Sequence, residues 1–262
     1  MGDEQIGPAR QDETVTAPPP AAAPRDRRVG WSLVGLFLVG QLTMVAVSVL
    51  VLLSHDPNGT AGLEDGRLLA LLLVPTASGA VLAAVGTGRF GGGPRSGRVW
   101  RELAVRPSLK DVAIGSAFGF GGLALTLPAA AVWAAWVGDD RASSAVGDAF
   151  AGRELPPAAA VVVFLAVWLV APAAEEVLFR GVLWRGLEHL GWNRWVVFAA
   201  TSVVFSLAHL ELLRTPLLLV LSIPIGLARL VTGNLLASVV AHQLNNFLPA
   251  LALLLATTGN LG

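Results

Sequence analysis

Long apolar runs separated by short polar stretches are the main pattern along this chain. Several of these runs reach the roughly 20 residues that a helix needs to cross a bilayer. We therefore predict an all-α fold, a polytopic transmembrane helical bundle of about seven or eight spans. The seven runs are Trp31–Leu53, Arg67–Val85, Val112–Val137, Pro157–Leu190, Trp195–Leu210, Leu217–Val231 and Leu235–Thr257.

The first 28 residues differ from the rest because they are rich in Ala, Pro and charge and lack apolar periodicity. Such a stretch cannot bury enough apolar surface to fold, so we expect residues 1–28 to form a disordered cytoplasmic tail. Residues 29–262 then form the transmembrane domain. The first apolar run is longer than a signal-peptide core of about 7–15 residues, and no small-residue cleavage site follows it.

Positive residues gather in the loop at residues 89–110, whereas the loops at 56–65 and 139–148 are acidic or nearly neutral. Loops rich in Lys and Arg tend to stay in the cytoplasm. We therefore expect a multi-pass protein of the cell membrane with a cytoplasmic N-terminus. Seven spans would place the C-terminus outside, and an eighth span or a re-entrant segment would reverse that. The positive residues of the loop are Arg89, Arg95, Arg98, Arg101, Arg106 and Lys110.

The composition supports a protein whose surface is covered by the lipid bilayer. Apolar residues make up 54% of the 262 residues and charged residues only 14%, against about 25% charged residues in a typical soluble domain. The net charge is zero, so the chain lacks the basic excess that binds nucleic acid. It has no cysteine, which excludes disulfides, cysteine-based zinc sites and thiol catalysis.

Ionisable residues inside an apolar segment are costly and need a partner or a cavity. The segment around residue 175 holds two adjacent carboxylates, Glu175 and Glu176, together with Arg180. Because Glu176 and Arg180 are four residues apart, they share a helix face and can form an ion pair. Glu175 then points elsewhere and must find its partner on another helix. The alternative is a solvated helix end at the cytoplasmic interface, as Arg185 nearby would favour.

Two further segments combine polar and apolar residues at helical spacing. Phe205 and His209 share one helix face, and so do His242 and Asn246, with Asn245 beside them. Each set alone is explained as well by an interfacial histidine or by hydrogen bonds between helices. Together with the carboxylates, however, they favour a polar cavity within the membrane.

These residues can support hydrolysis of an acyl bond, most plausibly a peptide. One glutamate and two histidines can hold Zn²⁺ with one position left for water. Alternatively, Glu175 and His209 activate water directly, while His242 and Asn246 donate hydrogen bonds to the oxyanion of a tetrahedral intermediate. The chain has neither a His-Glu-x-x-His string nor a Gly-x-Ser-x-Gly elbow.

Three motifs, in this order and each in an apolar context, resemble the signature of the CPBP family of intramembrane proteases. This family, also called the Abi family, is named for the processing of CAAX proteins and bacteriocins. The similarity covers about residues 158–255, and the first half of the chain matches only as generic membrane helices. The motifs are Glu175-Glu176-x-x-x-Arg180, Phe205-x-x-x-His209 and His242-x-x-x-Asn246.

The resemblance implies a membrane-embedded endopeptidase whose site lies in a cavity open towards the cytoplasm. It also implies a peptide or protein substrate, which in this family can be membrane-bound or prenylated. Family members are commonly described as metalloproteases, and a metal-free glutamate mechanism is also argued. The implied catalytic residues are Glu175, His209, His242 and Asn246, the supporting residues Glu176, Arg180 and Phe205, and the ligands of any Zn²⁺ Glu175, His209 and His242.

Counting along the runs places Glu175 near the cytoplasmic end of its span and His209 near the outer end of the next. These side chains can meet only if Pro157–Leu190 forms one long, tilted or kinked helix with Glu175 near mid-membrane. A helix of about 30 residues would measure about 45 Å, and Pro172 is a natural site for the kink. Two other functions stay open: a non-catalytic scaffold or immunity protein that keeps the cavity, and a proton-coupled transporter.

Overall fold

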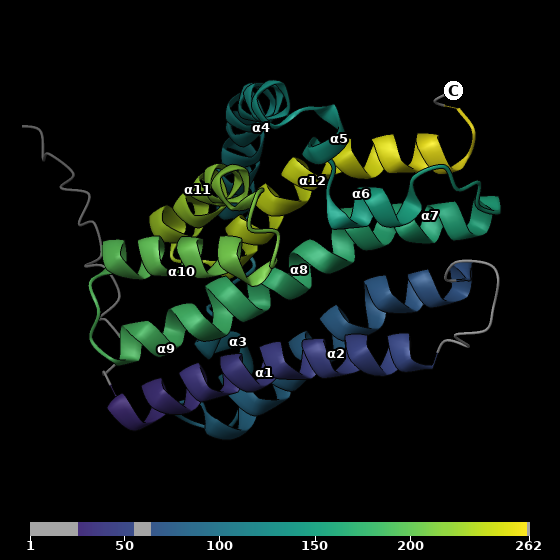
Figure 1. Ribbon diagram of the computed structural model, residues 1–262. Helices are drawn as coiled ribbons and strands as arrows, with labels where there is room; N and C mark the ends of the chain where they lie inside the picture. Colours follow the sequence, from purple (N-terminus) through teal and green to yellow (C-terminus); the bar gives the residue numbers. More distant parts are fainter. Residues whose placement is uncertain (1–25, 55–63, 261–262) are drawn as a thin grey trace, which may run out of the picture.

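The computed structural model describes residues 26–54 and 64–260, and in this part of the chain the only regular secondary structure is helical. Residues 1–25 of the tail expected at 1–28, and the acidic loop around Asp56, lie outside the described residues. The end of the expected tail is helical, because α1 begins at Arg27 with Asp26 as its N-cap. Figure 1 shows the helices. They are α1 (Arg27–Leu53), α2 (Asp65–Phe90), α3 (Arg98–Glu102), α4 (Leu109–Val137), α5 (Asp139–Ala142), α6 (Ala145–Phe150), α7 (Pro157–Leu165), α8 (Ala171–Glu176), α9 (Trp184–His189), α10 (Arg194–Ala208), α11 (Thr215–Thr232) and α12 (Leu235–Thr257).

The all-α membrane bundle that the apolar runs predict is confirmed. Among the described residues, six helices are long and apolar enough to cross a membrane, and α10 is a shorter apolar helix. These seven helical segments correspond to the seven apolar runs, but only six of them are long enough to be candidate spans. The three short helices α3, α5 and α6 fall in polar stretches where no helix is expected.

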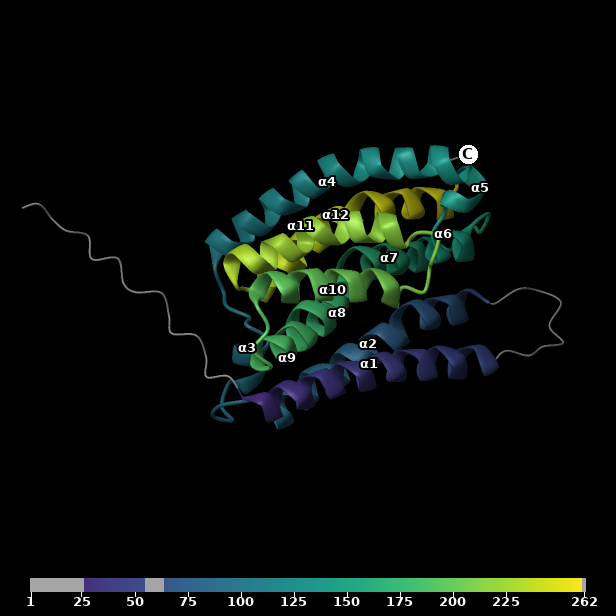
Figure 2. The ribbon, with the colours of Figure 1, turned by 60° about the vertical axis from the view of Figure 1, so that its left-hand side comes forward.

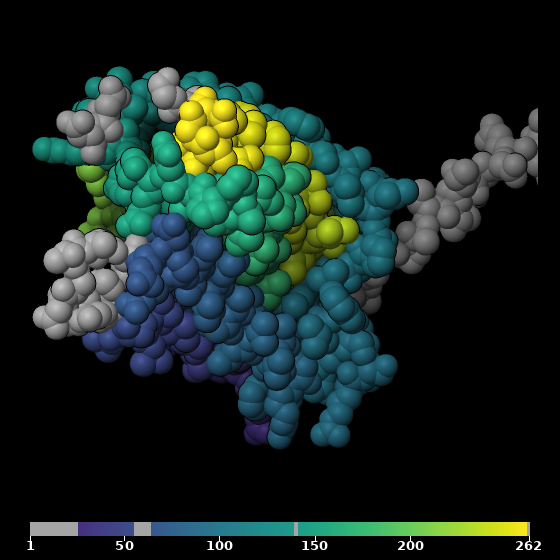
Figure 3. Space-filling model, turned by 90° about the vertical axis from the view of Figure 1, so that its right-hand side faces the viewer, coloured from purple at the N-terminus to yellow at the C-terminus, as the bar shows by residue number. Residues whose placement is uncertain are grey.

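The helices pack in layers around the segment from α7 to α9. Figure 2 shows the α1–α2 hairpin on one side of this segment, α10, α11 and α12 on the other, and α4 covering α11 and α12 from outside. Figure 3 views the end where α12 finishes, with α6 and α7 between α12 and α2. The segment from α7 to α9 therefore contacts both halves of the bundle.

The predicted long helix is present. Residues Pro157–His189 form one continuous helical segment of 33 residues, which corresponds to about 50 Å. Two π-helical stretches interrupt it, η1 (Ala166–Val170) before Pro172 and η2 (Val177–Leu183) directly after Glu176. Since π-helical turns often occur at functional sites, the irregular part of this helix coincides with the first motif.

Helix α10 does not extend across the whole bundle. It has 15 residues, about 22 Å, and it ends at His209, beyond which Leu210 has a positive φ of 58°. A polar turn with an ion pair between Glu211 and Arg214 follows before α11 runs back. In Figure 1 the end of α10 lies part-way along the bundle, beside α8. His209 thus lies deeper in the bundle than the outer end of a full span.

Small residues bring α4 and α12 close together. A side-chain Cβ at Gly115 would lie 2.5 Å from the carbonyl oxygen of Ala237, and one at Gly119 would lie 2.7 Å from Cβ of Leu244. Helices in membranes commonly approach one another over such small residues. This close packing fixes the position of α12, which carries the third motif.

Positive residues are concentrated at one end of the bundle. The start of α1, the end of α2, α3, the start of α4, α9, the start of α10 and the end of α11 all lie there, whereas α12 ends at the opposite side (Figures 1 and 2). The positive loop at residues 89–110, from which we expect a cytoplasmic N-terminus, therefore lies at the same end of the bundle as the start of α1. The residues are Arg27, Arg28, Arg89, Arg95, Arg98, Arg101, Arg106, Lys110, Arg185, Arg194 and Arg229.

Candidate active site

The carboxylate of Glu176 lies at the centre of the contacts that link the first and third motifs. It is completely buried, and its Oε1 accepts hydrogen bonds from Arg180 at 2.8 Å and from Nδ1 of His242 at 3.0 Å. The ion pair that the four-residue spacing predicts is therefore formed. Arg180 is also fully buried and donates to the hydroxyl of Ser222 on α11 at 2.6 Å. Glu176 thus connects the long helix to α12, and Arg180 connects it to α11.

Glu175 lies on a different face of α8 and is the more accessible carboxylate. Its side chain is 21% exposed, and its Oε2 lies 3.8 Å from Nε2 of His242. Since Nδ1 of His242 donates to Glu176, the other ring nitrogen is the one directed towards Glu175. The partner on another helix that Glu175 was expected to need is therefore His242, which stands between the two carboxylates.

The aromatic ring of Phe205 joins the second motif to the other two. Its centroid lies 4.7 Å from the ring of His209 and 5.6 Å from the ring of His242, in edge-on geometry. The guanidinium of Arg180 lies 4.6 Å from the same ring, a distance at which a cation is attracted to the aromatic face. Phe205 is 1% exposed, and its buried ring packs against both imidazoles.

His209 is positioned at the C-terminal end of α10. Its Nδ1 lies 2.8 Å from the carbonyl oxygen of Phe205. Because a carbonyl can only accept, Nδ1 carries the proton and Nε2 is left as the acceptor in the neutral ring. In the described part of the chain, His209 forms no direct hydrogen bond or ion pair with Glu175, so their shared contact with one water stays a prediction.

The two asparagines of the third motif have different partners. Asn246 donates through Nδ2 to the carbonyl oxygen of Val167 at 3.3 Å, inside the π-helical stretch η1. Asn245 instead faces α4, where it accepts from the hydroxyl of Thr126 at 3.3 Å and donates to the carbonyl of Gly119 at 3.4 Å. Asn246 therefore lies beside the long helix, one turn from His242, and Asn245 connects α12 to α4.

Several polar residues around the site were not expected from the sequence. Ser222 holds Arg180, and Arg229 donates from Nε to the backbone carbonyl of Arg180 at 3.1 Å. The guanidinium of Arg229 also lies 5.4 Å from the ring of Trp184. Like Glu175, Arg229 is an ionisable residue inside an apolar run. The criterion that singles out Glu175 in the sequence therefore also identifies Arg229. Ser222 gives no comparable signal, because serine is common in membrane helices.

The residues present do not form a metal centre in this arrangement. Within the described ranges, no group of three or more His, Cys, Asp or Glu side chains is placed to hold a metal ion. Of the expected ligands, His242 uses Nδ1 for Glu176, and His209 is turned by its bond to the backbone of α10. The expected Zn²⁺ at Glu175, His209 and His242 therefore stays a prediction, and we derive no step through it.

A second polar cluster lies at the positive end, where Glu102 of α3, outside the candidate spans, meets the end of the long helical segment Pro157–His189. Glu102 of α3 accepts from Nε2 of His189 at 3.1 Å, and Arg185 lies 3.9 Å away. Nδ1 of His189 in turn accepts from the backbone N–H of Asp26 at 3.3 Å. Burial alone would raise the pKa of Glu102, but the hydrogen bond from His189 and the charge of Arg185 outweigh it and lower that pKa. This cluster ties α1, α3 and α9 together.

Comparison with known proteins finds a family similar to the motif-bearing segment. Residues 157–248 match a family model described as type II CAAX prenyl endopeptidase Rce1-like. No curated protein and no solved structure matches the chain. The matched segment contains all three motifs. The family is one of endopeptidases, which act on peptides. Over residues 157–248 the chain is therefore similar to the type II CAAX prenyl endopeptidases of the Rce1-like family.

Proposed function

We propose that this protein is an intramembrane endopeptidase that hydrolyses a peptide bond with water activated by Glu175. The observation that carries the proposal is the pairing of the two carboxylates with one imidazole. Glu176 is buried and neutralised by Arg180, whereas Glu175 is partly exposed and only 3.8 Å from Nε2 of His242. The carboxylate of Glu175 is therefore the one that is available to react with water, whereas the carboxylate of Glu176 has a structural role.

In the proposed reaction, Glu175 takes a proton from a water molecule, and Nε2 of His209 orients that water as an acceptor. The water oxygen attacks the carbonyl carbon of the substrate, and negative charge develops on the carbonyl oxygen. His242 in its doubly protonated form, with one proton on Nδ1 bonded to Glu176 and the other on Nε2, stabilises this oxyanion together with the amide of Asn246. Glu175 then passes its proton to the leaving nitrogen, the C–N bond breaks, and a carboxylate and an amine are released.

Glu176, Arg180 and Phe205 act by positioning the reacting groups. Glu176 fixes the orientation of His242, Arg180 forms the ion pair with Glu176, and Phe205 packs against both imidazoles. Since Arg180 is held by Ser222 on α11, the whole arrangement rests on α8, α10, α11 and α12. The positive end of the bundle is assigned to the cytoplasm, from which the peptide would enter.

The test is cleavage of a panel of prenylated and unmodified peptides by the full chain in lipid vesicles. We expect Glu175→Gln to reduce cleavage about 10³-fold or more, and His209→Ala to reduce it about 10²-fold or more. Thermal unfolding of Glu175→Gln should be close to that of the wild type, because its side chain is partly exposed. Glu154→Gln, an identical chemical change at an exposed position, is the matched control and should retain activity.

Two results would contradict the proposal. If Glu175→Gln cleaves as fast as Glu154→Gln, Glu175 is not the base. If the folded wild-type protein cleaves no peptide of the panel and Glu175→Gln preserves its cellular phenotype, the protein is a scaffold that keeps the family cavity. Metal analysis of the same preparation decides between the metal-dependent and the metal-free mechanism, because Zn²⁺ bound at the site would be lost in His242→Ala.

A further inference from the structure

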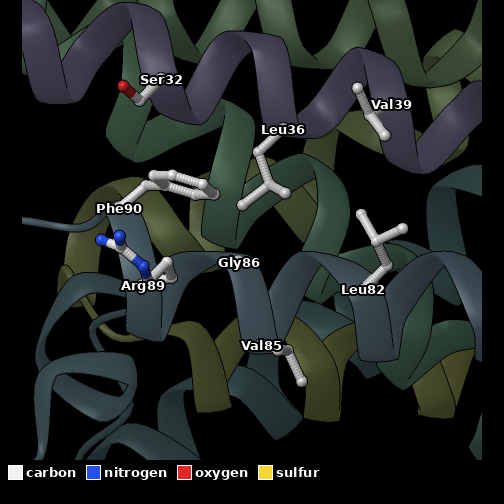
Figure 4. Close-up of a pocket in the computed structure, with 8 residues that line it drawn as sticks. All are labelled: Ser32, Leu36, Val39, Leu82, Val85, Gly86, Arg89 and Phe90. Carbon is white, nitrogen blue, oxygen red and sulfur yellow. The ribbon is translucent and has the colours of Figure 1, made fainter.

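A groove of about 550 Å³ lies between α1 and α2, on the side of the bundle away from α12. Figure 4 shows Leu36 and Leu82 reaching into it from the two helices. Val39 and Val85 line it with side chains that are 49% and 68% exposed. Its volume is in the range of about 300–1,000 Å³ that small-molecule sites occupy. Because both helices are membrane spans, this groove faces the lipid acyl chains.

The depth of the groove depends on a glycine. A Cβ at Gly86 would lie only 2.3 Å from Cδ1 of Leu36. The absence of a side chain at position 86 lets Leu36 lie against the backbone of α2. The floor of the groove is therefore formed by close helix packing, whereas its walls are aliphatic. Such a surface fits a flexible hydrocarbon chain.

One end of the groove is polar and positively charged. Ser32 and Arg89 lie at this end, next to Phe90 (Figure 4). Arg89 is exposed, and no carboxylate pairs with its guanidinium among the described residues; it lies 5.5 Å from the ring of Phe90. Arg28, one turn before Ser32 on α1, is exposed as well. The groove therefore combines an apolar channel with a positive end, at the depth where α1 begins and α2 ends.

We propose that this groove binds an anionic glycerophospholipid of the surrounding membrane. One acyl chain lies between α1 and α2 against Leu36 and Leu82, and the phosphate is held by the guanidinium of Arg89 and the hydroxyl of Ser32. Apolar surface alone would accept any lipid, but the unpaired charge of Arg89 favours a headgroup with a net negative charge. This site is separate from the proposed active site and does not depend on peptide cleavage.

The test uses the full chain reconstituted in equimolar phosphatidylglycerol and phosphatidylcholine, then extracted in mild detergent. The lipids that remain bound are measured by native mass spectrometry. We expect phosphatidylglycerol to be retained about fivefold over phosphatidylcholine, and Arg89→Gln to remove this preference. Arg95→Gln is the matched control, because Arg95 is also exposed at the positive end but does not line the groove. Leu82→Trp should displace both lipids, because residue 82 reaches from α2 into the groove and a larger side chain there fills the channel.

Three outcomes would overturn the proposal. The first is equal retention of the two lipids by the wild type, which would mean that any acyl chain fills the groove. The second is an equal loss of preference in Arg89→Gln and Arg95→Gln, which would mean general attraction to the positive end. The third is a dimeric mass that Leu82→Trp abolishes, since a second copy of the chain would then cover the groove. Glu175→Gln should retain lipid normally, so this result and the outcome of the cleavage assay are independent.

Discussion

Replacement of Glu176 by glutamine gives the sharpest test of how the site is held together. The change keeps the shape of the side chain and removes the charge that Arg180 and His242 share. Both Glu176 and Arg180 have no exposed surface, and they meet at 2.8 Å. In Glu176→Gln the guanidinium of Arg180 stays buried with Ser222 as its remaining side-chain partner. Removing one partner of a buried ion pair costs about 3–5 kcal/mol, so we expect a loss of stability of that size.

A second substitution separates the two roles of Glu176. Arg180→Gln alone should also cost about 3–5 kcal/mol, because it leaves the Glu176 carboxylate buried without its counter-ion. In the double variant Glu176→Gln/Arg180→Gln no charge remains, so the total loss should be about 2 kcal/mol less than the sum of the single losses. Cleavage should not recover with stability, because Nδ1 of His242 has still lost the carboxylate that orients it.

The assay combines denaturant unfolding in one detergent with cleavage measured on the same preparations. We expect the double variant to cleave about 100-fold more slowly than the wild type, and Glu154→Gln to match the wild type in both measurements. Strictly additive stability losses would show that Glu176 and Arg180 do not act as a pair. Recovery of cleavage in the double variant would show that Glu176 is not needed to orient His242.

Two further predictions follow from the contacts around the site and at the positive end. Asn245→Ala should destabilise the protein by about 1–3 kcal/mol, because it removes the buried hydrogen bonds with α4. Asn246→Ala should instead mainly slow cleavage, because Asn246 lies beside the long helix. If denaturant unfolding and the cleavage assay showed the opposite pattern, the structural role of Asn245 and the catalytic role of Asn246 would both be rejected. Because its pKa is lowered in the fold, Glu102 stabilises the protein above pH 4.5 and loses this contribution as the pH falls through the folded-state pKa. Melting temperatures between pH 3 and 7 should therefore fall more steeply on acidification in the wild type than in Glu102→Gln, and parallel curves would contradict this.

The sequence predicts the spans well because length and apolar composition alone decide whether a helix can cross a bilayer. The single long helix over Pro157–His189 was expected from a geometric requirement, that Glu175 reach the depth of His209, and the structure has it. The early end of α10 was not expected. Its apolar run looks like a span, and only the polar turn with Glu211 and Arg214 marks where the chain turns back.

The π-helical stretches could not be predicted from local sequence, because contacts from other helices accompany them. In η1 the carbonyls of Leu169 and Val167 accept from Gln243 and Asn246 of α12, at 3.3 Å in each case. In η2 the carbonyl of Arg180 accepts from Arg229 of α11. A π-helical turn changes the register of backbone bonding, and these side-chain donors satisfy carbonyl groups there. The pattern joins residues more than 48 positions apart, which periodicity within one helix does not reveal.

The different environments of the two adjacent glutamates follow from helix geometry. Neighbouring side chains on a helix point about 100° apart, so α8 cannot direct both carboxylates at the same partners. One is turned inward, where Arg180 and His242 satisfy it, and the other is turned towards Nε2 of that same histidine. His242 is therefore fixed by the buried carboxylate and presented to the accessible one. In the proposed mechanism Glu175 activates water, which requires that its carboxylate not be held in a firm ion pair like the one between Glu176 and Arg180.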